Sequence, residues 1–146
     1  IPMIQALEGA LKPWVGLGGH GGLSFAASDY VGSGSMTWTV AAGNVSTFTV
    51  KRVGVTVTLC FVINGTTVAG TPGATLKLRI PNGYKASVTS AQPYIATDNG
   101  SVAIAKAATV ADDNYVYFYP NLAGTGTWSA SAGATGMSGV ITFEVN

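Results

Sequence analysis

The sequence predicts an all-β domain, an antiparallel β-sandwich or jelly roll, preceded by a short N-terminal arm that is helical or extended. Three observations support this prediction. From residue 36 onward, apolar and polar residues alternate with a period of two, which is the side-chain period of a strand. Turn-forming pairs such as Asn-Gly and Pro-Gly separate these stretches, and threonine, which favours strands, is frequent in them. A chain of 146 residues with 47% apolar residues is long enough to form one hydrophobic core.

The first fifteen residues, 1–15, predict an arm rather than part of the sheet. Pro2 suits the first position of a helix, and apolar residues then recur at helical spacing. A helix this short is unstable alone in water, so we expect the arm to pack on the sheet or on a neighbouring subunit. The residues expected to make these assembly contacts are Ile4, Leu7, Leu11 and Trp14.

Residues 16–34 are rich in glycine and serine and predict a linker between the arm and a β-sandwich domain at 35–146. Gly16–Gly21 matches the dinucleotide-binding pattern G-x-G-x-x-G. That pattern needs a strand before it and a helix after it, and the sequence predicts neither here. We therefore expect a flexible loop and no cofactor. His20, in the same loop, is expected to be solvated or at an interface.

The domain at 35–146 is predicted to contain seven or more short strands, marked by alternation or by β-branched and aromatic residues. The predicted strands are Met36–Val40, Ser46–Arg52, Val55–Ile63, Thr75–Ile80, Tyr84–Ser90, Pro93–Thr97, Ser101–Lys106, Asn114–Tyr119 and Val140–Val145. The predicted turns lie at Gly43-Asn44, Asn64-Gly65, Pro72-Gly73, Asn82-Gly83 and Asn99-Gly100.

The alternation also predicts which side chains face the core. The inward residues of three strands are expected to be Val55, Val57, Leu59, Phe61 and Ile63, then Leu76, Leu78 and Ile80, and finally Ile141, Phe143 and Val145. Lys77 and Arg79 are expected on the solvent face of their strand, and Cys60 is expected to be a buried structural thiol.

Composition excludes several classes of protein. Charged residues make up only 9% of the chain and the net charge is +1, so the basic field that nucleic-acid binding requires is missing. The chain has one cysteine and one histidine, which excludes an internal disulfide and a multi-histidine metal site. It has no run of 18 apolar residues, so we expect no membrane insertion.

Acidic residues near turns are the remaining candidates for chemistry. Asp98 lies in a predicted turn, and Asp112 and Asp113 precede an aromatic strand. Paired carboxylates can catalyse glycoside hydrolysis or bind Ca²⁺, but adjacent residues of a strand point to opposite faces. We interpret all three as turn residues and keep a single bound Ca²⁺ as the alternative. The sequence thus predicts no catalytic, cofactor-binding or metal-binding residues, and the chain is expected not to be an enzyme.

The aromatic strand carries the strongest candidate for binding. Tyr115, Tyr117 and Tyr119 share one face of it, and Val116 and Phe118 share the other. The two apolar residues suit the core, so the tyrosines are expected to face outward. An exposed tyrosine row can form a subunit interface, contact a ligand such as a sugar, or pack against a second sheet.

A set of strand and turn residues between 34 and 146, about three-quarters of the chain, resembles a known module. The segments that carry the resemblance are Gly34–Val40, Val53-Gly54 with the strand that runs to Ile63, Gly65–Pro72, Leu78–Tyr84, Asp98–Gly100, Trp128 and Gly139–Val145. They resemble the β-sandwich module of tailed-bacteriophage virion proteins. This module occurs at the C-termini of tail-fibre and tail-spike chains and in related head-fibre and decoration proteins.

The resemblance implies a homotrimer exposed on the surface of the virion, in contact with other virion proteins and without a catalytic motif. It favours a tail-fibre or spike tip that recognises the host surface, with a host cell-surface glycan as the candidate ligand and the arm joining a fibre shaft. One alternative is a capsid decoration protein that stabilises the phage head, with the arm gripping the capsid. A second alternative is a carbohydrate-binding module.

Overall fold

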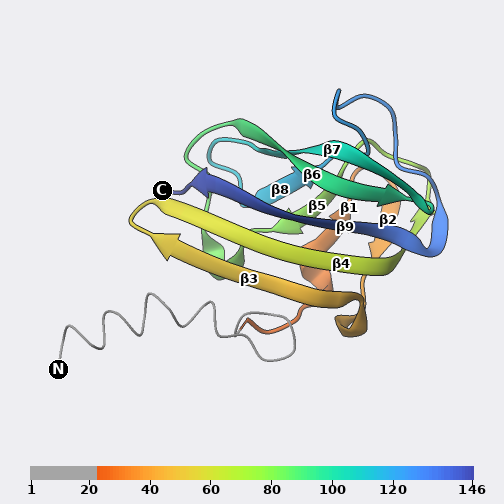
Figure 1. Ribbon diagram of the computed structural model, residues 1–146, viewed down its shortest axis with the longest axis horizontal. Helices are drawn as coiled ribbons and strands as arrows, with labels where there is room; N and C mark the ends of the chain where they lie inside the picture. The colour runs from red at the N-terminus through yellow and green to blue at the C-terminus, as the bar shows by residue number, and fades with distance from the viewer. Residues whose placement is uncertain (1–22) are drawn as a thin grey trace.

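Nine β-strands and three short 3-10 helices make up the part of the chain described by the computed structural model, residues 23–146 (Figure 1). The strands are β1 (Tyr30–Gly32), β2 (Met36–Thr39), β3 (Val45–Val53), β4 (Thr56–Gly70), β5 (Leu76–Arg79), β6 (Ser90–Asp98), β7 (Ser101–Thr109), β8 (Tyr115–Phe118) and β9 (Ser131–Glu144). The 3-10 helices are η2 (Ala27–Asp29), η3 (Ala42–Asn44) and η4 (Pro81–Gly83). The all-β prediction is confirmed. The arm residues Ile4, Leu7, Leu11 and Trp14, and also His20, lie outside the described residues.

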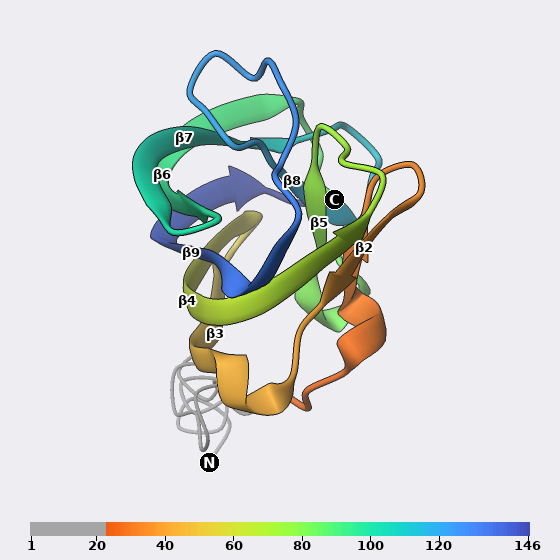
Figure 2. The same cartoon turned by 90° about the vertical axis from the view of Figure 1, so that its right-hand side faces the viewer.

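All the strands belong to one antiparallel sheet, whose order is β1-β5-β8-β7-β6-β9-β4-β2. The long strand β4 has two partners on its outer edge. Its first part pairs with β3 and its last part pairs with β2. The strands β1 and β2 stand at opposite ends of this order, yet they contact each other. The sheet therefore curls round into a nearly closed barrel, flattened like a sandwich, as Figure 2 shows.

The core lies between the two walls of this curled sheet. Val57, Leu59, Phe61 and Ile63 of β4 are completely buried, as the alternation predicts. Phe61 packs edge to face against Phe118 with their ring centroids 5.3 Å apart. The inward residues predicted for the strands Thr75–Ile80 and Val140–Val145 are buried as well: Leu76, Leu78, Ile80, Ile141, Phe143 and Val145. Cys60 is only partly buried, contrary to the prediction, because it alternates with the core residues of β4 and points away from them.

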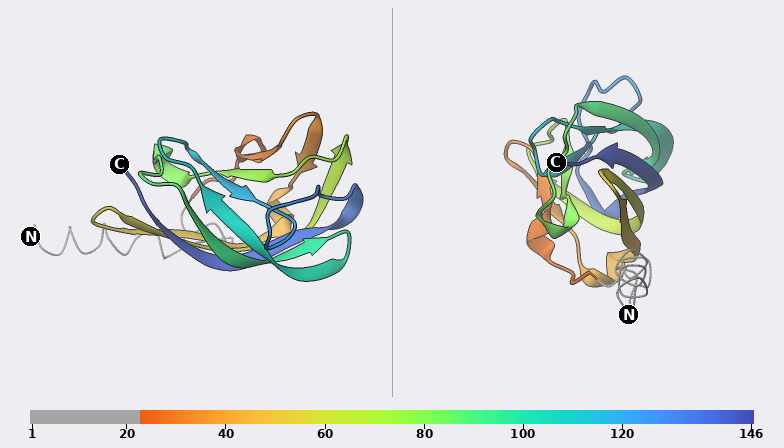
Figure 3. Two further views of the ribbon diagram at one scale, coloured as in Figure 1. Left: turned by 90° about the horizontal axis from the view of Figure 1, so that it is seen from above. Right: turned by 90° about the vertical axis from the view of Figure 1, so that its left-hand side faces the viewer.

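Val55 differs from its predicted position and is 53% exposed. The reason is the tight hairpin between β3 and β4, which projects at one end of the molecule (Figure 3). Val53 pairs with Thr56, so Gly54 and Val55 form a two-residue turn beyond the core. Gly54 has a φ of +60°, which suits glycine in such a turn.

The pair Asn64-Gly65 is not a turn, contrary to the sequence prediction. It lies inside β4, where the register against β9 shifts between Ile63 and Thr66. Gly65 has a φ of +70° at this bulge. A glycine with positive φ suits a β-bulge as well as a turn, which is why the sequence signal was ambiguous. As a result β4 continues to Gly70.

Two further segments differ from the predicted strands. Tyr30–Gly32 lies in the range predicted to be linker, but it forms β1 and pairs with β5, so the described fold starts before residue 35. Tyr30 is buried and packs edge to face on Trp38. The range 84–90 does not form the predicted strand, because only Ala86 makes a bridge, to Val145, before β6 begins at Ser90.

Candidate ligand-binding surface

The outer face of β8 carries the tyrosine row. Val116 and Phe118 are completely buried, and the side chains that alternate with them point away from the core. Tyr115 and Tyr117 of β8, and Tyr119 just after it, are each partly exposed. The predicted orientation of this strand is therefore confirmed. Tyr115 and Tyr117 are accessible to a ligand or a partner, whereas Gly124 of the following loop lies against the side chains of Tyr119 and Lys106.

Basic side chains from both neighbouring strands lie over these rings. Lys77 of β5 pairs in register with Tyr117, and its Nζ is 5.2 Å from the ring centroid of Tyr115. On the other side, Nζ of Lys106 in β7 is 4.4 Å from the ring centroid of Tyr119. Cations at these distances are attracted to the negative face of an aromatic ring. We call the set Tyr115, Tyr117, Tyr119, Lys77, Arg79 and Lys106 the tyrosine–cation face.

Arg79 is held in place by neighbours on both sides. Its Nε lies 3.3 Å from Oδ1 of Asp29, and its Nη2 donates a hydrogen bond of 2.8 Å to the hydroxyl of Tyr115. Arg79 therefore joins η2 to β8 and positions Tyr115. In the described part of the chain, neither Lys77 nor Lys106 makes an ion pair.

The hydroxyl of Tyr117 is also fixed. It donates a short hydrogen bond to Oδ2 of Asp113, and Oδ1 of that carboxylate accepts a 2.7 Å bond from the backbone of Asn114. The hydrogen bond to Asp113, helped by partial burial, raises the pKa of Tyr117 to about 12. The ring of Tyr117 is consequently held in one orientation, with its hydroxyl protonated at neutral pH.

The other two candidate acids are engaged by polar groups of the protein. Asp98 accepts hydrogen bonds of 2.8 Å and 3.1 Å from the backbone and the hydroxyl of Ser129. Asp112 accepts a 3.0 Å bond from the side-chain amide of Asn146. Within residues 23–146, no group of three or more His, Cys, Asp or Glu side chains gathers as metal ligands would. These contacts tie Asp98 to the segment before β9 and Asp112 to the residue at position 146, so both carboxylates are engaged by distant parts of the chain.

Small residues beside the tyrosines make the surface flat. Tyr117 pairs with Ala108 of β7, and Ala108 pairs with Ala91 of β6. Across the strands, the neighbours on this face are therefore the ammonium group of Lys77, the ring of Tyr117 and the methyl groups of the two alanines. Alanine at these two positions leaves Tyr117 without a large side chain next to it on this side of the strand.

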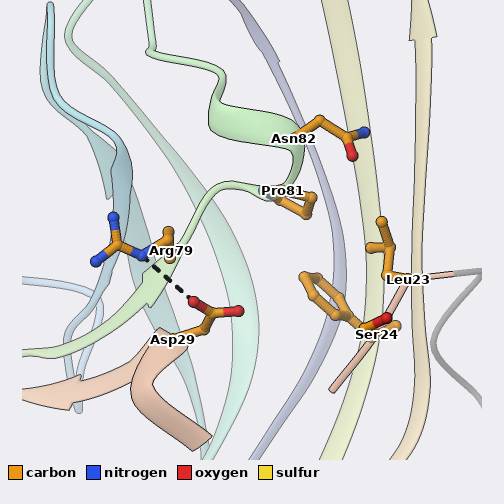
Figure 4. Close-up of a pocket in the computed structure, with 7 residues that line it drawn as sticks. Leu23, Ser24, Asp29, Arg79, Pro81 and Asn82 are labelled. Atoms are coloured by element: carbon orange, nitrogen blue, oxygen red, sulfur yellow. Dashed lines mark ion pairs between the residues drawn. The ribbon is translucent and has the colours of Figure 1, made fainter. Parts of the chain in front are cut away.

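A cavity of about 210 Å³ adjoins this surface at Arg79 (Figure 4). The ion pair between Arg79 and Asp29 forms one wall, and Leu23 and Ser24 lie on the opposite side. Phe48, Pro81 and Asn82 complete the lining. The guanidinium already binds both Asp29 and Tyr115, and the rest of the lining combines apolar side chains with the polar groups of Ser24 and Asn82.

A second accessible surface is apolar and lies on β6, β7 and β9. Ile95 and Ile104 pair across β6 and β7 and are 48% and 63% exposed. They border a shallow groove with Pro93, Ser138 and Gly139, and the nearby Val102 and Val140 are also exposed. We call Ile95, Val102, Ile104 and Val140 the aliphatic face.

Sequence reasoning did not identify the aliphatic face. Val102 and Ile104 marked the strand Ser101–Lys106, but the residues of β7 that reach the core are Ala105, Ala107 and Thr109. The signal available in the sequence was the alternation itself, because small alanines on one face and large aliphatic residues on the other indicate that the large ones point outward.

Comparison with protein-family models, with curated proteins and with solved structures finds no match to this chain. Among residues 23–146, no helix has the length and apolar character needed to span a membrane. The function therefore has to be inferred from the two surfaces and from the chemistry of their side chains.

Proposed function

We propose that this chain is a non-enzymatic structural protein of a bacteriophage virion, a homotrimeric tail-fibre or spike tip that recognises the host surface. The observation that carries the proposal is the tyrosine–cation face, an aromatic row on the outer side of a rigid sheet. The resemblance of residues 34–146 to the phage virion module provides the biological setting, with the protein at the particle surface.

The tyrosine–cation face has the properties of a recognition surface rather than a catalytic one. Its rings are fixed by Asp113 and by Arg79, so little conformational entropy is lost when a ligand covers them. Tyrosine rings present apolar area together with a polar hydroxyl, which suits both carbohydrate and protein partners. The carboxylate nearest the row, Asp113, already binds Tyr117 and the backbone of Asn114.

A capsid decoration protein is the second candidate, and the aliphatic face favours it. Ile95, Ile104, Val102 and Val140 present large apolar side chains on adjacent strands. A contiguous apolar patch of this kind is typical of a contact with another protein. In a decoration protein it would lie on the capsid or on a neighbouring subunit. A carbohydrate-binding module would use the tyrosine–cation face alone and would not belong to a particle.

Immunogold labelling of intact virions with an antibody against this domain, viewed by electron microscopy, tests the proposal. We expect label on tail fibres or at the tail tip. Label spread over the head would support the decoration protein instead, and particle stability without the chain would then be measured. Particles that encode the chain but carry no label would contradict both virion functions and leave the carbohydrate-binding module.

A further inference from the structure

We propose that the tyrosine–cation face binds an anionic saccharide, a sugar polymer that bears carboxylate or phosphate groups. Lys77 and Lys106 would hold acid groups at the two sides of the tyrosine row, and sugar rings would lie on Tyr117 and the small residues beside it. This inference rests on the proposed host-surface function and names the chemical class of its ligand.

The concentration of basic residues on this face is the first argument. The whole chain has only seven Lys and Arg residues, and three of them, Lys77, Arg79 and Lys106, lie on the tyrosine–cation face. Two carboxylates lie beside them, Asp29 paired with Arg79 and Asp113 bonded to Tyr117, so three cations against two carboxylates leave a small positive excess on this face. A ligand that carries negative charge would be attracted to this part of the surface.

The pairing of the charges is the second argument. Arg79 is neutralised by Asp29, and the carboxylate of Asp113 is bound by the Tyr117 hydroxyl. No ion-pair partner in the described chain holds Lys77 or Lys106. The ammonium group of Lys77 lies over Tyr115 and Tyr117, and that of Lys106 lies over Tyr119 and against Gly124. A cation–aromatic contact at an exposed site is weak, so each ammonium group can still bind an external anion.

The arrangement of the rings is the third argument, and it favours sugars. Tyr117 is flanked in register by Lys77 on one side and by Ala108 and then Ala91 on the other. The methyl groups leave a flat strip beside the ring, with an acid-binding group at one end. Sugar rings have apolar C–H faces that pack on aromatic side chains, while their acid substituents need a cation.

Single-stranded nucleic acid is the competing ligand, because it also combines stackable rings with negative charge. Single-strand binders stack successive bases on successive open aromatic rings. Here cations lie over the rings of Tyr115 and Tyr119, so the row offers no such series of open faces and nucleic acid is disfavoured. We therefore assign the saccharide and use an oligonucleotide as a competing probe.

The test is isothermal titration calorimetry of the full chain with four probes. They are polygalacturonate, which bears carboxylates, poly(glycerol phosphate), which bears phosphates, neutral dextran, and a single-stranded oligothymidylate. Binding to at least one of the two acidic polymers, weaker at high salt and stronger than binding to dextran, is expected. The acidic polymer that binds more tightly identifies the acid group.

Variants then connect this binding to the two lysines. The double change Lys77→Gln with Lys106→Gln should weaken binding of the acidic polymer by about tenfold, because two exposed charge contacts are lost. Lys85→Gln, at an exposed lysine that makes none of the tyrosine contacts, is the matched control and should leave binding unchanged. Both variants keep the core intact, so thermal unfolding should match the wild type.

Several outcomes would overturn the inference. They are dextran binding as tightly as the acidic polymers, the oligonucleotide binding more tightly than they do, and no binding of any probe. A fourth is binding of an acidic polymer with the same affinity to the wild type and to the double lysine variant. Binding of dextran through the tyrosines would remove the anionic class but keep a saccharide-binding tip. The proposed virion function is tested separately by the immunogold experiment. Absence of label on the virion would contradict that function, whichever polymers bind.

Discussion

Thr66→Val tests whether a buried chain of hydrogen bonds holds three strands together. The indole nitrogen of Trp38 in β2 donates a 2.9 Å hydrogen bond to the hydroxyl of Thr66 in β4. That hydroxyl in turn donates a 2.8 Å bond to the carbonyl oxygen of Thr135 in β9. Thr66 and Thr135 are completely inaccessible to solvent, so water cannot replace either bond. Valine keeps the shape of threonine and removes only the hydroxyl.

The cost of this substitution follows from the groups it leaves behind. The buried indole N–H of Trp38 would lose its acceptor, at a cost of about 1–3 kcal/mol, and the bond to the carbonyl of Thr135 contributes about 1 kcal/mol more. We therefore expect the free energy of unfolding to fall by about 2–4 kcal/mol. For a domain of this size that corresponds to a decrease in Tm of roughly 6–20 °C.

Urea unfolding followed by tryptophan fluorescence measures the effect, with the midpoint expected to fall and the slope to stay constant. Thr58→Val is the matched control, because Thr58 is on the same strand but bonds to Thr142 on the outer face. It should change stability by less than about 0.5 kcal/mol. If Thr66→Val were no more destabilising than Thr58→Val, the buried bonds would contribute nothing to the junction of the three strands.

Three further predictions concern separate parts of the fold. Because the hydrogen bond to Asp113 and partial burial raise the pKa of Tyr117 from 10.0 to about 12, the native state holds this proton more tightly than the unfolded state. Stability should therefore fall as the pH rises from about 10 to 12, and urea titrations should show a smaller fall in Tyr117→Phe. Gly100→Ala should lower the free energy of unfolding by about 1–2 kcal/mol, measured by thermal unfolding, because Gly100 has a φ of +84°. Gly43→Ala is the control and should be nearly neutral, because Gly43 has no positive φ and an added methyl group would meet no neighbouring atom. Ile104→Lys should leave Tm unchanged but reduce self-association in sedimentation velocity; an unchanged sedimentation profile would remove the aliphatic face as a subunit contact.

The residues of long alternating strands could be assigned to the core from sequence because their pattern has a single interpretation. Val57 in β4 lies between two threonines and Phe118 in β8 lies between two tyrosines, and both are completely buried as predicted. The strand β1 could not be found in this way. It has only three residues, too few for a period, and it is a strand because Tyr30 packs on Trp38 and because β5 offers a free edge.

The tyrosine row could be predicted, but the cations around it could not. Tyr115, Tyr117 and Tyr119 lie within five residues of one another, so their common face follows from strand geometry alone. Lys77 and Lys106 come from β5 and β7, and their positions depend on the order of strands and the register between them. Sheet order is a property of the whole fold, and no local pattern in this sequence specifies it.

The position of β9 has a consequence for how the chain folds. This strand is the last in the sequence, yet it lies in the middle of the sheet, between β6 and β4. Its pairing brings together residues as distant as Thr56 and Glu144. Contacts of such long sequence separation form slowly, and a growing chain on the ribosome cannot make them before the residues of β9 emerge. Until then β4 and β6 each expose an unpaired edge, which is the form in which neighbouring chains aggregate or exchange strands.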